Sequence, residues 1–247
     1  MPKFFVEDHQ ILNEKNLEIQ GEDVRHIRDV LRLKKEDEIQ VCNLEKGENY
    51  LCKILEFREK TVLCEMIQKV KSEAEPKNQI VVYQALPKQE KMEWILQKAT
   101  ELGMEALVPV VMSRCIVKLD EKSTHKKVER WQKIVESAAK QSGRDRIPNV
   151  DMPCAIKELT EKISEFDVFL VAYEKEESHT LKEELKQLKK KQNRIAILIG
   201  PEGGITTEEV LMLQENGAKV VTLGKRILRT ETVALNMISN ILYELEE

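Results

Sequence analysis

The sequence predicts an α/β protein with two domains, a small β-rich domain over residues 1–72 and a larger domain over 73–247. Three observations lead to this expectation. Short apolar runs of strand length fill the first domain, and a charged segment over 69–78 lacks periodicity and contains a proline. After that segment, strand-like runs alternate with amphipathic helices, which is typical of a mostly parallel sheet covered by helices on both faces.

The amino-terminal domain is expected to be a small barrel interrupted by one helix. Its candidate strands are residues 4–6, 17–19, 38–42, 50–57 and 61–67. The helix is expected over 23–33, with an apolar face and three arginines beside it. These residues are Val24, Ile27 and Leu31 on the apolar face, and Arg25, Arg28 and Arg32 at helical spacing. Taken alone, the arginines indicate a solvated face.

The second domain is expected to repeat strand and helix. Strands are predicted over 79–86, 106–111, 168–173, 194–199 and 219–223, and helices over 89–102, 126–142 and 231–245. The helix over 126–142 carries an apolar stripe that includes Val128, Trp131 and Val135. A basic stripe runs along another side through Lys126, Arg130, Lys133, Lys140 and Arg144. This basic side either faces RNA or only solubilises the helix.

Glycines mark the end of the strand over 194–199. Gly200, Gly203 and Gly204 follow it, and Thr206 with Glu209 fits a capping box that opens a helix. Gly203-Gly204 allows positive φ and close approach of the backbone to a ligand. Exposed amides next to a helix start favour acceptors and negative charge. The motif therefore indicates either a ligand site or a tight turn without a ligand.

A second glycine motif repeats this arrangement. The strand over 219–223 ends at Gly224, and a helix begins near Thr230, so we expect two glycine-marked strand ends side by side. Arg226 and Arg229 between them can hold phosphate or a polar transition state. Alternatively they are solvated, or paired with a carboxylate such as Glu231. Neither a P-loop nor a Gly-x-Gly-x-x-Gly sequence occurs, which excludes the common nucleotide sites.

The charge is unevenly distributed. The chain carries a net charge of −4, yet residues 113–147 contain ten Lys and Arg against five acids. A local basic patch matters more than the total charge, because phosphate contacts are short-ranged at cellular salt. RNA binding is therefore compatible with the net negative charge of the chain.

The remaining composition is that of a protein that stays in the cytoplasm. The five cysteines are scattered without metal-site spacing and indicate reduced core thiols and no metal. No apolar run suits a signal peptide or a membrane span. The last helix has an apolar band wider than a surface helix needs, which favours either an intrachain core or a dimer interface through residues such as Ile241.

Four blocks in order make the sequence resemble the SPOUT class of RNA methyltransferases, and within it the RsmE family of 16S ribosomal RNA uridine-N3 methyltransferases. The blocks are residues 200–204, 223–232, 86–88 with 93–103, and Gln141-Ser142-Gly143-Arg144. The resemblance implies a PUA-like RNA-binding amino-terminal barrel, a carboxyl-terminal trefoil knot, a homodimer through the last helix, and S-adenosyl-L-methionine as cofactor. Lys140 and Val233 depart from the usual family pattern.

The resemblance also implies roles for individual residues. Arg229 would stabilise the anion that develops on the base, and Glu231 would orient Arg229; the general base stays unassigned. The cofactor positions implied are Tyr173, Gly200, Glu202, Gly203, Gly204, Leu223, Gly224, Ile227 and Leu228. The RNA positions implied are Arg25, His26, Arg32, Lys88, Arg114, Arg130, Lys133, Arg144 and Arg226.

Two alternatives to this function stay open. One is a noncatalytic RNA-binding or ribosome-assembly factor with the same basic faces. The other is a SPOUT methyltransferase that acts on another RNA, such as transfer RNA. The sequence does not identify the target nucleotide, nor whether the substrate is free 16S ribosomal RNA or the assembled small subunit.

Overall fold

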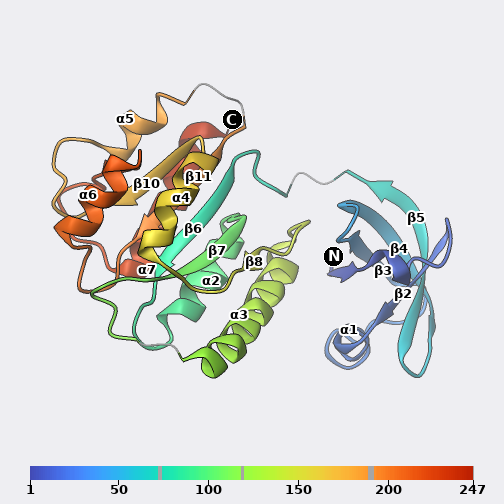
Figure 1. Cartoon of the computed structure of the whole chain (residues 1–247). Coiled ribbons are helices and arrows are strands. Elements are labelled where there is room, and N and C mark those ends of the chain that lie inside the picture. Colours follow the sequence, from blue (N-terminus) through green and yellow to red (C-terminus); the bar gives the residue numbers. More distant parts are fainter. Residues whose placement is uncertain (72–73, 118–119, 189–191, 247) are drawn as a thin grey trace. The chain divides into compact units, whose positions relative to one another are not determined.

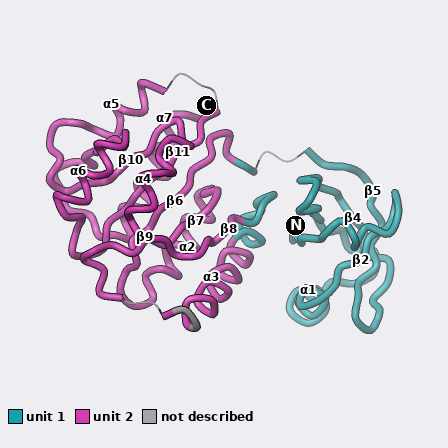
Figure 2. Tube along the Cα trace, in the orientation of Figure 1, with its two compact units in different colours: residues 1–75, 139–147 teal, residues 76–138, 148–247 magenta. Residues whose placement is uncertain are grey.

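The chain folds into two compact units, seen in a computed structural model that describes residues 1–71, 74–117, 120–188 and 192–246, without the side chains of residues 121 and 122 (Figure 1). The first unit contains residues 1–75 together with 139–147, and the second contains 76–138 and 148–247 (Figure 2). The predicted boundary between residues 72 and 73 lies outside the described residues. The sequence did not indicate that residues 139–147 belong with the first unit.

All five predicted strands form the sheet of the first unit. Their order is β1-β3-β4-β5-β2, with β1 parallel to β3 and the other pairs antiparallel. Because the order ends at β1 and β2, the sheet is a half-barrel around an apolar core that includes Leu17, Val41 and Ile54. The strands are β1 (Lys3–Val6), β2 (Asn16–Gln20), β3 (Glu38–Asn43), β4 (Glu48–Phe57) and β5 (Thr61–Val70).

The helix of the first unit is shorter and wider than predicted. It consists of α1 (Glu22–Arg25) and a π-helical turn, η2 (His26–Val30). The Leu31 amide donates to the His26 carbonyl, five residues back, at 2.9 Å. The wider turn rotates Leu31 outward, to 38% exposure, and Leu33 packs against the core instead. The prediction that Leu31 lies on the buried face is therefore wrong.

Residues 139–147 are held on the first unit by buried charges. Lys3 pairs with Asp145, and the Arg144 guanidinium binds the Glu75 carboxylate with its Nε at 3.2 Å from Oε1. Glu75 Oε1 also accepts from the amides of Asp145 and Arg146, at 2.8 and 3.1 Å. The Arg144 side chain is only 4% exposed, so it does not continue an exposed basic stripe as expected.

Lys140 also forms an ion pair inside the first unit. Its Nζ lies 2.7 and 2.9 Å from the two carboxylate oxygens of Asp23 in α1. The Cys42 thiol donates to the Asp145 carbonyl at 3.1 Å, and burial raises the pKa of Cys42 to about 11. The exposed basic stripe of the predicted helix is thus confined to its earlier residues.

The second unit is built on a parallel sheet of order β12-β10-β11-β6-β7-β8, with β9 also pairing with β7. Each of its recorded strand pairs is parallel, as the alternation of strands and helices predicted. The strands are β6 (Gln79–Ala85), β7 (Ala106–Val111), β8 (Asn149–Val150), β9 (Cys154–Ala155), β10 (Val168–Ala172), β11 (Arg194–Ile199) and β12 (Lys219–Val221).

Helices cover both faces of this sheet, as predicted. α6 (Thr207–Glu215) and the short α4 (Leu159–Lys162) pack over one face, where Ala196 and Leu198 meet Val210. α2 (Lys91–Glu101), α5 (Leu181–Leu185) and α7 (Thr230–Leu245) lie together on the other face. α3 (Glu121–Ser142) begins in the second unit, where Gln132 joins it to Val150 of β8, and its last residues belong to the first.

The apolar band of α7 is part of the core of a single chain. Ala234, Met237, Ile238 and Ile241 are fully buried without any partner molecule. Of the two alternatives that the sequence left open for Ile241, the structure therefore bears out the intrachain core. Tyr243 on the same helix is 87% exposed.

Candidate functional site

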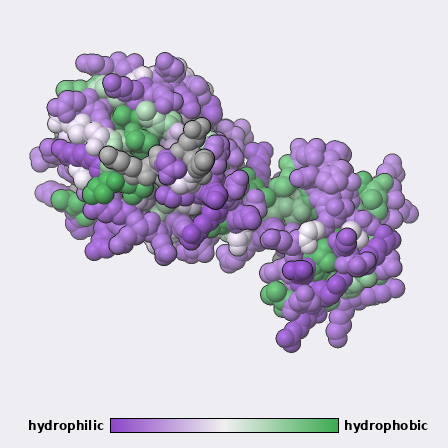
Figure 3. All heavy atoms as spheres, turned by 60° about the horizontal axis from the view of Figure 1, so that its bottom comes forward, coloured by the Kyte–Doolittle hydropathy of each residue, from purple (hydrophilic) through white to green (hydrophobic). Residues whose placement is uncertain are grey.

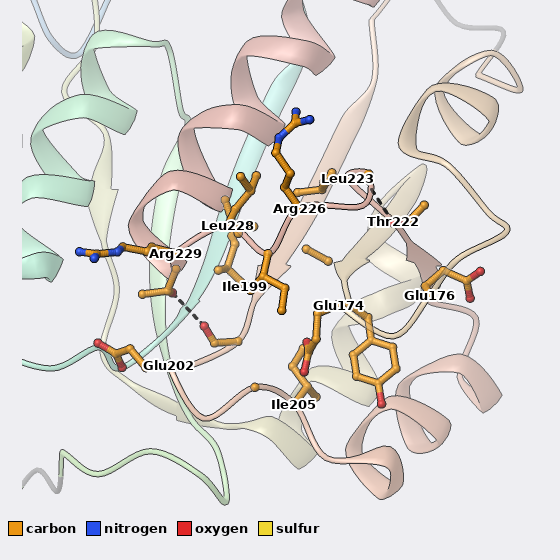
Figure 4. A pocket seen from close by; sticks show the side chains of 18 of the residues that line it. Glu174, Glu176, Ile199, Glu202, Ile205, Thr222, Leu223, Arg226, Leu228 and Arg229 are labelled. Carbon is orange, nitrogen blue, oxygen red and sulfur yellow. Dashed lines mark hydrogen bonds between the residues drawn. The ribbon is translucent and has the colours of Figure 1, made fainter.

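A pocket of about 1120 Å³ opens at the carboxyl ends of β10, β11 and β12. Three loops of the second unit line it, residues 173–180 after β10, 200–206 after β11, and 222–229 after β12 (Figure 4). In open parallel sheets, ligands bind outside the carboxyl ends of the strands. The volume slightly exceeds the range of about 300–1,000 Å³ that is common for small-molecule sites.

The two glycine-marked strand ends are not adjacent. β10 lies between β11 and β12, so the prediction that these ends lie side by side is wrong. The loops nevertheless converge, because the Tyr173 amide at the end of β10 donates to the Val221 carbonyl of β12 at 3.2 Å. Tyr173 therefore lies in the pocket between the two glycine loops.

Each glycine of the first motif is needed for a different steric reason. A Cβ on Gly200 would lie 2.6 Å from Ile205 Cγ1, and one on Gly203 would lie 3.2 Å from Arg114 Cβ. Gly204 has a φ of +72°, and its amide closes a turn on the Pro201 carbonyl at 2.8 Å. The positive φ expected of Gly203-Gly204 thus belongs to Gly204.

The structure brings all nine sequence-predicted cofactor positions into one pocket. The lining also includes residues that the sequence did not indicate, among them Lys91, Glu174, Glu176 and Thr222. Glu174, Glu176 and Thr180 belong to the loop after β10, where no motif marked a site. The nine positions are Tyr173, Gly200, Glu202, Gly203, Gly204, Leu223, Gly224, Ile227 and Leu228.

Glu176 shapes the loop after β10. Its Oε1 accepts from the hydroxyl and the amide of Ser178, at 2.7 and 2.8 Å, and from the His179 amide at 2.9 Å. These hydrogen bonds, with the Ser178 hydroxyl contributing most, lower the pKa of Glu176 to about 2. Glu176 is therefore an anion at neutral pH and holds this wall of the pocket.

Arg226 and Arg229 both line the pocket and are exposed, and their side chains point in different directions (Figure 4). Glu231 does not pair with Arg229. Its Oε2 lies 3.1 Å from Lys91 Nζ. Within the described residues, no hydrogen bond or ion pair of the Arg229 side chain is present. The expected orientation of Arg229 by Glu231 is therefore not seen.

A chain of hydrogen bonds lies under the pocket floor. Gln84 Nε2 of β6 donates to Thr230 Oγ1 at 2.9 Å, and Thr230 Oγ1 donates to the Gly200 carbonyl at 2.8 Å. Thr230 is the first residue of α7, so this chain joins the start of α7 to the glycine loop. Its position places the exposed Arg229 at the pocket rim.

The sequence-predicted RNA positions are divided between the two units. Arg25, His26, Arg32 and Arg144 belong to the first unit, and the other five belong to the second. Arg25, His26 and Arg32 are exposed, and Arg32 has a φ of +53°. Arg144 is buried against Glu75 and cannot meet phosphate.

On the second unit, Lys88, Arg114, Arg130, Lys133 and Arg226 are exposed. Arg114 Nη1 donates to the Gly203 carbonyl at 2.8 Å, so it supports the glycine loop. Arg130 lies 2.8 Å from Glu93 and stays 65% exposed. An exposed ion pair of this kind contributes little and leaves the arginine available.

The part of the chain that the structure describes holds neither a metal-binding cluster nor a membrane-spanning helix. No group of three or more His, Cys, Asp and Glu able to hold a metal occurs within residues 1–71, 74–117, 120–188 and 192–246. All five cysteines are free thiols, and all but Cys115 are buried. In the same ranges, no helix has the length and apolar character needed to cross a membrane. The face drawn in Figure 3 is largely hydrophilic.

Fold and site together define a class. A parallel sheet covered on both faces, a glycine-lined pocket at its carboxyl edge and a free arginine at the rim belong to an α/β protein that binds a small ligand. The chain is a member of the RNA methyltransferase family, whose domain model matches residues 73–242. An RNA methyltransferase PUA domain matches residues 19–67.

Curated relatives and solved structures agree with this family. Ribosomal RNA small subunit methyltransferase E of Bacillus subtilis is 36% identical over all of this chain and 98% of its own length. The enzyme of that name from Neisseria gonorrhoeae, bound to S-adenosyl methionine, is 31% identical with a TM-score of 0.86, covering 98% of this chain and 97% of its own. A Legionella pneumophila putative methyltransferase with bound SAM is 27% identical with a TM-score of 0.83, covering 98% and 96%.

These findings confirm the resemblance to the RsmE family and the expected fold class of a parallel-sheet domain with a PUA-like half-barrel. The trefoil knot stays a prediction that the resemblance implies.

Proposed function

We propose that this protein transfers a methyl group from S-adenosyl-L-methionine to N3 of a uridine in 16S ribosomal RNA. The observation that carries the proposal is the pocket where the loops 200–206 and 222–229 meet beside the exposed Arg229. The names of the curated relatives support the RNA substrate, and the two structures with bound cofactor support the methyl donor.

The pocket fits S-adenosylmethionine, which would supply a methyl group activated by its sulfonium. Gly204 and Gly224 have φ values of +72° and +105°, and a Cβ on Gly224 would meet nothing within 4 Å, so the backbone is open to a ligand. Ile227 is 87% exposed although it lines the pocket. An apolar side chain so placed is suited to cover the adenine or the sulfonium side of a bound cofactor.

Arg229 is proposed to act on the base. N3 of neutral uridine carries a proton that must leave before N3 can accept the methyl group. Its loss spreads negative charge over N3 and the base oxygens, which a donor must stabilise until methyl transfer neutralises the base. A guanidinium without a carboxylate partner can address two acceptors in a plane. Glu231 is kept as a residue of the site, in contact with Lys91 rather than with Arg229. The general base is left unassigned.

RNA contacts are proposed for the exposed cations of both units. On the first unit these are Arg25, His26 and Arg32, and on the second Lys88, Arg114, Arg130, Lys133 and Arg226. Arg144 is left out because it is buried. The RNA can be free 16S ribosomal RNA or part of the assembled small subunit.

A homodimer that acts in the cytoplasm completes the proposal. The inner face of α7 is buried in the core of the chain, so support for the dimer comes from its outer side. There Tyr243 is exposed and Leu242 beside it is half-buried. Together they give this end of α7 an apolar surface that a second copy of the chain can cover.

The direct test is a map of methylated nucleosides in ribosomal RNA from a strain that lacks this gene. We expect loss of one 3-methyluridine in 16S ribosomal RNA and its return with the intact gene. An unchanged map would contradict the proposal, and loss of a methyl group from transfer RNA would reassign the substrate.

The noncatalytic alternative has its own test. Calorimetry with S-adenosylmethionine should show one site per chain for an enzyme. A folded sample without cofactor binding would favour an RNA-binding or assembly factor.

A further inference from the structure

Lys91 occupies a bridging position that the chemistry proposed above does not use. It lies in the first turn of α2, and its Nζ is 3.2 Å from Glu202 Oε1 and 3.1 Å from Glu231 Oε2. Glu202 belongs to the glycine loop, and Glu231 to the first turn of α7. A single ammonium therefore joins three segments that are far apart in the sequence.

The bridge is partly shielded from water, and its contact with Glu231 is an ion pair only, because the buried Glu231 Oε2 makes no hydrogen bond among the described residues. The exposed fractions of the three side chains are 26% for Lys91, 26% for Glu202 and 17% for Glu231. Glu202 Oε1 also accepts from the Lys88 amide at 3.1 Å. Ion pairing, chiefly with Glu231, raises the pKa of Lys91, so the ammonium is charged at neutral pH.

We propose that Lys91 is a positioning residue, which sets the distance between the glycine loop and Arg229. Arg229 immediately precedes α7, two residues before Glu231, and Thr230 between them is bonded to the Gly200 carbonyl. The Lys91 bridge on the outside and the Thr230 bond on the inside thus connect the same two segments. The inference rests on the proposed methyl transfer, in which the loop holds the cofactor and Arg229 meets the base.

The role follows from electrostatics. Without Lys91, two carboxylates that now share one cation repel each other in a partly dry site. The glycine loop and the start of α7 then move apart. A shift of about 1 Å between reacting groups can cost about a hundredfold in rate.

The test compares Lys91→Met with Lys91→Arg and with a matched control on the same helix. The control is Lys98→Met, because Lys98 forms an ordinary helical pair with Glu101 at 2.8 Å and does not line the pocket. Cofactor affinity is measured by calorimetry, and the rate by single-turnover methyl transfer with saturating cofactor and RNA.

We expect Lys91→Met to slow the single turnover at least about tenfold and to bind RNA within about twofold of the parent. Lys91→Arg should keep most of the rate, since a guanidinium can bridge two carboxylates. The double variant Lys91→Met/Glu231→Gln removes one of the two repelling charges. Its single-turnover rate should be at least about threefold higher than that of Lys91→Met alone. Lys98→Met should change neither the single-turnover rate nor the RNA affinity by more than about twofold.

Three results would overturn the inference. These are a Lys91→Met rate within about twofold of the parent, an equal loss in Lys98→Met, or no recovery in the double variant. If Lys91→Met fails to fold, Lys91→Gln carries the same test, and a parental rate in that variant would refute the bridge. A parent that transfers no methyl group would instead refute the proposed function. In that case a Lys91→Met cofactor affinity equal to that of the parent would refute the positioning of the glycine loop by Lys91.

Discussion

Arg229 carries a guanidinium without a partner among the described residues, unlike the nearby cations Lys91 and Arg114. Lys91 is held by Glu202 and Glu231, and Arg114 donates to the Gly203 carbonyl. Among the described residues, the Arg229 side chain has no recorded partner and lies exposed at the pocket rim. A cation that is not neutralised in the resting site is available to charge that appears only during reaction.

Arg229→Ala should reduce single-turnover methyl transfer at least about a hundredfold, as for loss of a preorganised donor, with cofactor affinity changed only a few-fold. Arg229→Lys should rescue poorly because it lacks the planar fork. Arg226→Ala is the comparison, since Arg226 lies in the same loop but points elsewhere; as a proposed RNA contact it should lower RNA affinity and keep the rate at saturating RNA. A near-parental rate in Arg229→Ala would remove it from the chemistry, and a selective loss of cofactor affinity would make it a cofactor ligand.

Gly204 and Gly203 form a second contrast between adjacent residues. Gly204→Ala should weaken cofactor binding at least about tenfold, since a side chain at φ +72° is strained by about 1–2 kcal/mol and its Cβ would lie 2.6 Å from Glu174 Oε1. Gly203→Ala should have a smaller effect, because its nearest neighbour would be Arg114 Cβ at 3.2 Å. Calorimetry with S-adenosylmethionine decides, and equal affinities in the two variants would contradict this ranking.

At the scale of elements, α7 has two functions on two sides. Its inner side supplies Ala234, Met237, Ile238 and Ile241 to the core, and its first residue, Thr230, joins it to the glycine loop. On its outer side, Tyr243 is exposed in the single chain and can contact a second copy. The same helix thus couples the pocket to the proposed dimer interface.

Tyr243→Glu should separate the dimer and leave the fold intact, because the side chain is 87% exposed in one chain. Ile241→Glu should instead unfold the protein, because burying an unpaired charge is among the most destabilising changes. Equilibrium sedimentation at micromolar concentration, with thermal unfolding of the same samples, separates the two outcomes. A parent that sediments as a monomer would refute the dimer, and a dimeric Tyr243→Glu would place its interface elsewhere.

At the scale of the whole molecule, the chain returns to its first unit after most of α3. Residues 139–147 belong to that unit, held by the Arg144 pair with Glu75 and the Lys3 pair with Asp145. Loss of a buried charge such as Arg144 should lower stability, whereas loss of an exposed charge such as Lys133 should lower RNA affinity. Experiment can therefore separate the roles of these two basic residues.

Arg144→Met should destabilise the protein by about 3 kcal/mol, since removing one partner leaves the other charge partly buried. The RNA affinity of the folded protein should stay within about twofold. Lys133→Met, at an exposed position, should show the reverse, with unchanged unfolding and weaker RNA binding that depends less on salt. Denaturant unfolding and RNA titration at two salt concentrations test both, and a stable Arg144→Met with weak RNA binding would contradict the assignment.

Local patterns along the chain predicted the longer elements, and the family resemblance implied nine of the pocket residues. The five strands of the half-barrel, the βαβ alternation and both glycine loops follow from periodicity and turn chemistry, which act over a few residues. The resemblance could imply nine pocket positions because two motifs carry it and contain all of them except Tyr173.

Tertiary structure alone decided which of these segments meet. β10 lies between β11 and β12, Leu31 turns outward on a π-helical turn, Glu231 faces Lys91, and Arg144 is buried by Glu75. Helical spacing places Arg130, Lys140 and Arg144 on one stripe, but it does not reveal which of them a carboxylate distant in the sequence will neutralise. Such pairings depend on strand order and on long-range packing, whose free energies arise between segments and leave no trace in the periodicity of either one.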